Sequence, residues 1–224
     1  MEGFFLKVSV MLVPALLAIT CHEVSHGFIA DRFGDPTARR MGRLTLNPLR
    51  HLDIIGTLMI FFVGIGWAKP VPVNFGNLHR PKRDMIWVAA AGPATNFLLA
   101  AASGWGLRWC YAALRGGGGT AILEPVILML GFSLYINLLL GLFNLIPLPP
   151  LDGGRVLVGL LPFRQAAALA RVEPYGMIII IVLVFFTDLF GKVISPFLYR
   201  GIMFLAGPEA SIIFDRLFRE VLSL

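Results

Sequence analysis

The chain has 224 residues, of which 57% are hydrophobic and 14% charged, with a formal net charge of +6. A soluble domain of this size could not bury so much apolar surface, so the composition excludes an ordinary soluble protein and predicts one embedded in lipid. The basic residues fall between apolar runs and not beside clustered aromatic side chains. This pattern argues against a nucleic-acid partner and is typical of a protein that faces anionic lipid.

Uncharged stretches predict the membrane segments. Three are long enough to cross about 30 Å of hydrocarbon at about 1.5 Å per residue: Val8–Ala30 (which contains only the polar cluster discussed below), Met85–Leu107 and Pro125–Leu151. Pro174–Thr187 is a shorter candidate. Val193–Gly207 is weaker still, because it contains a proline and an arginine.

Ile54–Ala68, between the first and second full spans, has only 15 uncharged residues, and three of them are glycines. That length is short for a crossing and suits a re-entrant or β-like element that returns to the same side. We therefore expect an all-α polytopic membrane protein with about four to six membrane segments. The chain has no repeat and no room for an appended soluble domain, so residues 1–224 are predicted to form a single domain.

The Lys and Arg residues predict the orientation. If segments 31–53, 69–83, 155–171 and 216–219 share one face, that face holds 14 of the 19 basic residues. The N-terminus then lies outside and the first helix runs inward. We expect a multi-pass protein of a prokaryotic cell membrane, with its active site nearer the cytoplasmic side.

The first span ends in His22-Glu23-Val24-Ser25-His26. Histidines at positions i and i+4 differ by about 40° around a helix and about 6 Å along it, so both imidazoles can reach one metal ion. Glu23 lies beside them, within reach of a water at that metal. A chance origin would have to explain three ionisable groups on an apolar membrane helix, where such groups are costly and rarely lack a function.

Catalytic zinc takes three protein ligands and leaves one position open for water. Three further acids lie close to apolar runs on the inner side: Asp53, Asp84 and Asp152. Asp152 is the favoured ligand. The three prolines just before it must break the helix, and irregular backbone at membrane depth is tolerated only where it is buried or lines a wet cavity. Taken alone, Asp152 could equally be a helix cap or turn residue.

Together these motifs resemble the site-2 protease family of intramembrane zinc metalloproteases. His22–His26 and Asn144–Gly154 carry the resemblance, and three motifs between them agree with it: Gly42–Pro48, Gly66–Asn74 and Ala91–Asn96. The similarity covers about residues 15–160, most of the chain.

The resemblance implies one Zn²⁺ per chain, held by His22, His26 and Asp152, with Glu23 as the general base. It also implies that Asn144 helps to hold the substrate or the oxyanion. Gly92, Pro93 and Asn96 would line a helix beside the active site, where Asn96 is a candidate substrate-binding residue. An alternative role for Asn144 is to bond loosened backbone near the prolines.

The predicted activity is hydrolysis of peptide bonds within or near the transmembrane segments of membrane-protein substrates. A membrane-anchored protease of soluble chains is one alternative, although such enzymes usually take a downstream Glu as third ligand. A zinc transporter would need ligands in both halves of the membrane. An inactive scaffold that binds membrane helices is disfavoured by the presence of Glu23. Substrate identity and oligomeric state are left open by the sequence.

The stretch Lys69-Pro70-Val71-Pro72-Val73-Asn74 could bind an unwound substrate. In an extended chain the two prolines lie on one edge, while Val71 and Val73 direct their N–H groups to the other. One edge is thus blocked and the other is left open to a substrate strand, which in lipid needs partners for its backbone. The alternative is an ordinary proline-rich connector.

Overall fold

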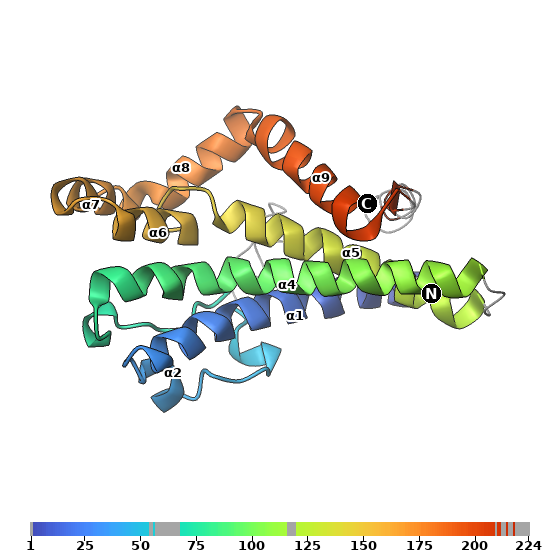
Figure 1. The fold of residues 1–224 in the computed structure, drawn as a ribbon, viewed down its shortest axis with the longest axis horizontal. Helices are drawn as coiled ribbons and strands as arrows, with labels where there is room; N and C mark the ends of the chain where they lie inside the picture. Colours follow the sequence, from blue (N-terminus) through green and yellow to red (C-terminus); the bar gives the residue numbers. More distant parts are fainter. Residues whose placement is uncertain are drawn as a thin grey trace. The chain divides into compact units, whose positions relative to one another are not determined.

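The computed structural model describes residues 2–53, 56, 68–115, 120–208, 210, 211, 214 and 217. Three long helices dominate this part of the chain (Figure 1): α1 (Glu2–Arg32), α4 (Pro81–Arg115) and α5 (Thr120–Asn144). The shorter helices are α2 (Thr37–Arg40), α6 (Asp152–Leu160), α7 (Phe163–Ala170), α8 (Glu173–Phe186) and α9 (Ser195–Ala206). Two 3-10 turns, η1 (Pro48–Arg50) and η2 (Phe75–Asn77), and a π-helical turn, η3 (Phe190–Ile194), complete the set.

Within the described ranges, three helical stretches are long and apolar enough to cross a membrane: Lys7–Arg32, Pro81–Arg115 and Leu123–Asn144. Helices α7 and α8, bent by 66° at their junction, add a fourth if the pair forms one span. The prediction of an all-α polytopic membrane protein is confirmed, at the lower end of the number expected. The segment 193–207 falls on η3 and α9, and α9 has only 12 residues.

The expected re-entrant element, Ile54–Ala68, lies outside the described residues apart from Gly56 and Ala68. At its base, Leu52 and Ala68 form an isolated antiparallel bridge, and the N–H of Lys69 donates to the carbonyl of His51 at 2.8 Å. This bridge is the one β pairing in the part of the chain that the structure describes. It brings the two ends of the expected element together.

The chain divides into two compact units. One comprises Met1–Ala18, Asn96–Phe143 and Val184–Leu224, and the other Ile19–Thr95 and Asn144–Leu183. Helices α1, α4, α5 and α8 each contribute residues to both units. The single-domain organisation expected from the sequence stays a prediction.

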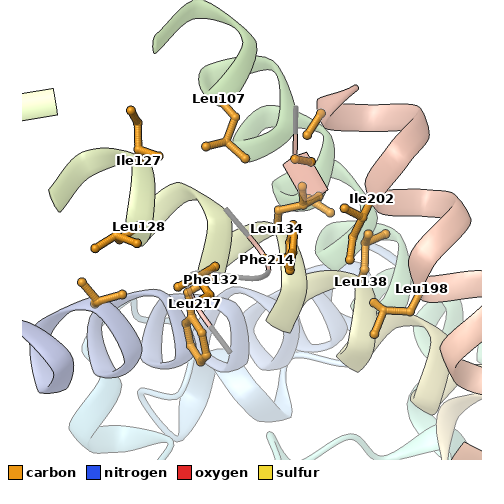
Figure 2. Close-up of a cluster of buried hydrophobic side chains, with 14 residues drawn as sticks. Leu107, Ile127, Leu128, Phe132, Leu134, Leu138, Leu198, Ile202, Phe214 and Leu217 are labelled. Carbon is orange, nitrogen blue, oxygen red and sulfur yellow. The ribbon is translucent and has the colours of Figure 1, made fainter. Parts of the chain in front are cut away.

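The first unit has an apolar core formed by α1, α4, α5 and α9 (Figure 2). Lipid tails are as apolar as leucine, so helices in a membrane associate through close packing and not through exclusion of water. Glycine provides that closeness here: a Cβ at Gly104 of α4 would lie 2.8 Å from Cβ of Leu205. The buried members of this core that Figure 2 labels are Leu107, Ile127, Leu128, Phe132, Leu134, Leu138, Leu198, Ile202, Phe214 and Leu217.

A buried polar network also joins three helices of this unit. Asn96 of α4 donates to the carbonyl of Ala18 at 3.3 Å and to Oδ1 of Asn137 at 2.9 Å. Asn137 in turn donates to the carbonyl of Ser133, and the hydroxyls of Ser133 and Ser103 are 2.8 Å apart. Such bonds between membrane helices are worth about 1 kcal/mol each, so the network fixes the register of α1, α4 and α5.

The second unit carries the polar motifs. Its helices pack through glycines: a Cβ at Gly159 of α6 would lie 2.4 Å from Cγ1 of Ile86 on α4. On α8, a Cβ at Gly176 would meet the carbonyl oxygen of Pro149 at 1.9 Å. A small apolar cluster of Ala30, Leu78 and Val88 also belongs to this unit. The close contact at Gly176 holds the proline-rich loop before α6 against α8.

Candidate metal centre

Helix α1 presents His22 and His26 on one face, as the spacing predicts. Their side chains are buried, and the two Nε2 atoms are 3.1 Å apart. Asp152, the first residue of α6, faces them: its Oδ2 lies 3.2 Å from Nε2 of His22 and 3.3 Å from Nε2 of His26. The structure therefore brings together the three residues expected to hold the metal.

The hydrogen bond at Nδ1 of His26 determines which tautomer the neutral ring adopts. Nδ1 lies 2.7 Å from the carbonyl oxygen of Val88, which can only accept, so Nδ1 must donate. In the neutral ring, Nε2 then carries a lone pair and points towards Asp152. Metal-binding histidines commonly fix their ring in this way, through a carbonyl on the far nitrogen.

The loop before α6 places Asp152. Helix α5 ends at Asn144, and the prolines that follow cannot continue a helix. The chain then folds back tightly onto Gly153 and Gly154, where added Cβ atoms would lie 2.3 Å from the carbonyl oxygen of Leu145 and 2.2 Å from the nitrogen of Pro149. The two glycines are needed because the loop backbone occupies that space. Asp152 is thereby turned towards α1.

The three ligand atoms fit a tetrahedral zinc ion. Ligands at 2.0–2.1 Å on tetrahedral corners are about 3.3–3.4 Å apart, close to the separations found here. Oδ2 of Asp152 is buried and makes no hydrogen bond, although both imidazoles lie nearby. A buried carboxylate facing nitrogen lone pairs calls for a cation.

The other two acids considered as ligands have local roles. Oδ2 of Asp84 accepts from the N–H of Arg80 at 2.7 Å, at the start of α4. Oδ1 of Asp53 accepts from the N–H of Gly56 at 2.8 Å. Both carboxylates thus accept hydrogen bonds from backbone N–H groups a few residues away. Among the described residues, His22, His26 and Asp152 form the one group of three or more such side chains able to hold a metal ion.

Gly92 of α4 borders the same site. A Cβ there would lie 2.5 Å from Nε2 of His26 and 2.6 Å from Nε2 of His22. The lack of a side chain keeps the space beside both nitrogens open. Gly92 therefore lies beside both histidines, while the role of the rest of its motif stays a prediction.

Glu23, between the histidines in sequence, contacts the proline-rich segment. Its Oε2 accepts the backbone N–H of Val71 at 2.7 Å. Gly27, one turn further along α1, makes room for the same residue, because a Cβ at Gly27 would lie 2.8 Å from Cγ1 of Val71. Val71 is thus held against α1 by both its backbone and its side chain.

Two side chains outside the predicted site also hold the segment. The guanidinium of Arg43 donates to the carbonyls of Lys69 and Pro70, at 2.9 and 3.3 Å. The buried carboxylate of Asp35 accepts from the N–H of Asn74 at 2.7 Å. Both follow α1 in the chain. Arg43 falls within the motif Gly42–Pro48, for which no chemical role was predicted, and Asp35 falls within none of the motifs.

The carboxylate of Asp35 is surrounded by donors. Besides Asn74, it accepts from Nδ2 of Asn77 at 2.9 Å and from both the N–H and the hydroxyl of Thr37. Burial alone would raise the pKa of Asp35, but these hydrogen bonds outweigh it and lower the pKa below its ordinary value. The charged form of Asp35 is therefore part of the folded structure.

The remaining candidate residues are placed as follows. Asn144 is the last residue of α5, partly buried, in the same unit as Asp152. The N–H of Val73 has no partner among the described residues. Asn96 lies in the other unit and forms part of its polar network. The substrate-binding roles of Val71, Val73 and Asn96 stay predictions.

Comparison with known proteins adds independent evidence. The profile of peptidase family M50 matches residues 113–187. A Bacillus subtilis (strain 168) protein named "Putative zinc metalloprotease YwhC" is 40% identical over 195 residues, which is 85% of this chain and 86% of that protein. Proteins named "Putative zinc metalloprotease Rip2" are 33% identical in Mycolicibacterium smegmatis (75% of this chain, 63% of theirs) and 30% identical in Mycobacterium tuberculosis H37Rv (79% and 67%). No solved structure matches.

Proposed function

The chain belongs to peptidase family M50, the site-2 proteases, and we propose that it is a zinc endopeptidase that cleaves membrane proteins within or near their transmembrane segments. The observation that carries this proposal is the convergence of three buried ligand atoms, from His22, His26 and Asp152, on one point beside an apolar helix. Glu23, the general base in our proposal, lies on that same helix.

The depth of the site supports cleavage inside the membrane. His22 and His26 belong to the candidate span Lys7–Arg32, and at about 1.5 Å per residue they lie about 15 and 9 Å before its charged end at Arg32. That depth supports a metal centre within the hydrocarbon rather than at its surface. A soluble protein chain would have no access at that depth, whereas a membrane-spanning substrate would.

Each residue has a distinct task in the proposed hydrolysis. When bound, zinc supplies a Lewis acid for the scissile carbonyl and lowers the pKa of water towards 7. Glu23 accepts the proton of the attacking water and passes it to the leaving amine. Asn144 donates its side-chain amide to the developing oxyanion, and loss of such a donor typically costs about 3–4 kcal/mol.

The segment Lys69–Asn74 is the proposed docking site for the unwound substrate. Pro70 and Pro72 cannot donate, so only the edge that carries the N–H groups of Val71 and Val73 is open to pairing. The N–H of Val73 is unpaired among the described residues, which supports this role. The N–H of Val71 is already donated to Glu23, so a substrate strand would have to share or displace that bond.

The alternatives make different demands on the chain. A zinc transporter would need a second ligand group, and none occurs in the described ranges. A scaffold that only binds membrane helices would not need a carboxylate placed between the two histidines. A membrane-anchored protease of soluble chains would carry its site outside the apolar helix. The orientation that we propose, with the metal centre nearer the cytoplasm, follows from the basic loops.

A direct test uses the purified chain in lipid vesicles, loaded with zinc and given a single-span membrane protein as substrate. Mass spectrometry of the products should place the cut within or next to the hydrophobic segment. Cleavage confined to soluble polypeptides would support the surface-protease alternative. No cleavage of any single-span substrate tried, with zinc bound, would favour the scaffold.

A further inference from the structure

Arg43 is a basic residue buried in the second unit. It is 7% exposed, and no carboxylate pairs with it among the described residues. Burying a guanidinium costs several kcal/mol unless its donors are satisfied. Its Nη2 is satisfied by two carbonyl oxygens, of Lys69 and Pro70, while its Nε is buried without a partner.

There is a physical reason why the proline-rich segment is bonded to the side chain of Arg43. Pro70 and Pro72 lack N–H groups, so the segment that contains them cannot be held by a regular β ladder on that edge. Its backbone is held instead by side chains and by the Lys69–His51 bond at its start. Arg43 donates hydrogen bonds to the two carbonyls immediately before Val71. The backbone N–H of Arg43 donates in turn to the carbonyl of Ala38 at 2.9 Å, which fixes the backbone of Arg43 itself.

What Arg43 positions is the donor to Glu23. The carbonyl of Pro70 and the N–H of Val71 belong to one planar peptide unit, so a force that fixes the first fixes the second. That N–H meets Oε2 of Glu23 at 2.7 Å. We propose that Arg43 is a positioning residue, which aligns the Pro70–Val71 peptide with the carboxylate of Glu23 and thereby orients the general base. The catalytic part of this inference rests on the proposed function.

Hydrogen–deuterium exchange of the zinc-loaded chain tests the positioning without reference to activity. Lys69–Asn74 contains four exchangeable amides, because two of its six residues are prolines. Arg43→Met should speed exchange in a peptide covering this segment by about tenfold or more, since the Val71 amide loses its bond. Arg43→Lys, which keeps donors for the carbonyls, should restore part of the protection. Arg40→Met, an exposed arginine three residues away, is the matched control and should change nothing.

Activity per bound zinc supplies the second readout. Arg43→Met should lower kcat by about 10- to 100-fold with zinc still bound, because misplacing a catalytic group costs rate. It should also raise KM, because Arg43 holds the segment that is the proposed docking site. Arg43→Lys should recover part of the rate, and it decides the matter if Arg43→Met does not fold. Unchanged exchange over 69–74 in both variants would overturn the proposal. So would exchange that rises equally in peptides of α4, since Arg43 would then only stabilise the fold.

Failure of the proposed function gives a different pattern. A wild-type chain that binds zinc but hydrolyses no membrane substrate would refute the protease assignment, while the exchange result would still show whether Arg43 holds the Val71 amide. Full activity per zinc in Arg43→Met, with wild-type activity intact, would refute the catalytic part of the inference alone.

Discussion

Gly92 of α4 lies so close to His26 that an added Cβ would come within 2.5 Å of its Nε2. In a helix interior, Ala is normally about 1 kcal/mol more favourable than Gly. We expect Gly92→Ala to keep the fold but to lose bound zinc, because its methyl group would fill the space beside both imidazoles. Metal analysis of the purified protein checks this. Gly106→Ala on the same helix, which meets only the mobile end of Leu130, should keep its zinc. Stoichiometric zinc in Gly92→Ala would contradict the placement of the metal.

The proline-rich segment predicts unequal effects of backbone changes. Val71→Pro removes the donor to Glu23, and Val73→Pro removes the amide proposed for the substrate strand. Both should cut cleavage strongly with zinc and fold intact, as measured by rates normalised to bound zinc. Pro72→Ala should matter far less. Equal damage from all three changes, or none from any, would count against a docking role for this edge.

Asp35 predicts a pH dependence of stability. Its pKa is lowered on folding, so its stabilisation is present above the unfolded value of about 3.9 and is lost as the pH falls through the folded value. Every partner of its carboxylate is a donor, so the amide NH₂ of an Asn would oppose one of them. Asp35→Asn should cost about 2 kcal/mol at pH 7. The difference in unfolding temperature between Asp35→Asn and wild type, measured by thermal unfolding in detergent, should shrink below about pH 4.

The exposed Asp188 provides the control for that experiment. Asp188→Asn should leave the unfolding temperature within about 1 °C of wild type at both pH values, since surface changes usually cost under about 0.5 kcal/mol. If the unfolding temperature of Asp35→Asn differs from that of wild type by the same amount at pH 7 and at pH 3.5, a stabilising carboxylate at this position is ruled out.

Cysteine labelling tests the proposed orientation of the chain in the membrane. Helix α4 begins near Arg83 and ends at Arg115, and its 35 residues span about 52 Å, more than a bilayer core. In a chain whose native Cys21 and Cys110 are replaced, single cysteines at 83 and 115 should react with an impermeant reagent from opposite sides. Position 83 should react from the cytoplasm. Labelling of both from one side would refute the topology drawn from the basic residues.

Much of the site could be predicted because helix geometry is local. The i, i+4 spacing alone places His22 and His26 on one face. The broken helix before Asp152 favoured it among three acids, and the resemblance to a known family implied the same ligand. The prolines before Asp152 indicated where α5 must end. Sequence could not show that Asp53 and Asp84 bond to nearby backbone N–H groups, because the same residue types serve both purposes.

The hydrogen bonds that hold the site together could not be predicted from sequence patterns. Arg43 was counted among the basic residues that report orientation, yet it is buried and bonded to carbonyls. Its partners are backbone atoms 26 and 27 residues away, and backbone acceptors leave no mark in a sequence. The Glu23–Val71 bond was missed for the same reason. Sequence motifs show side-chain types, whereas tertiary hydrogen bonds to backbone atoms depend on the path of the chain.

The central claim is that His22, His26 and Asp152 hold a catalytic zinc for which Glu23 is the base. Zinc content and cleavage rate, measured together on Glu23→Gln and Asp152→Ala, test it most directly. Glu23→Gln should keep one zinc per chain and lose cleavage, because Gln cannot take the proton. Asp152→Ala should lose both, since two imidazoles remain of three ligands. Stoichiometric zinc with normal cleavage in Asp152→Ala, or normal cleavage in Glu23→Gln, would contradict the claim.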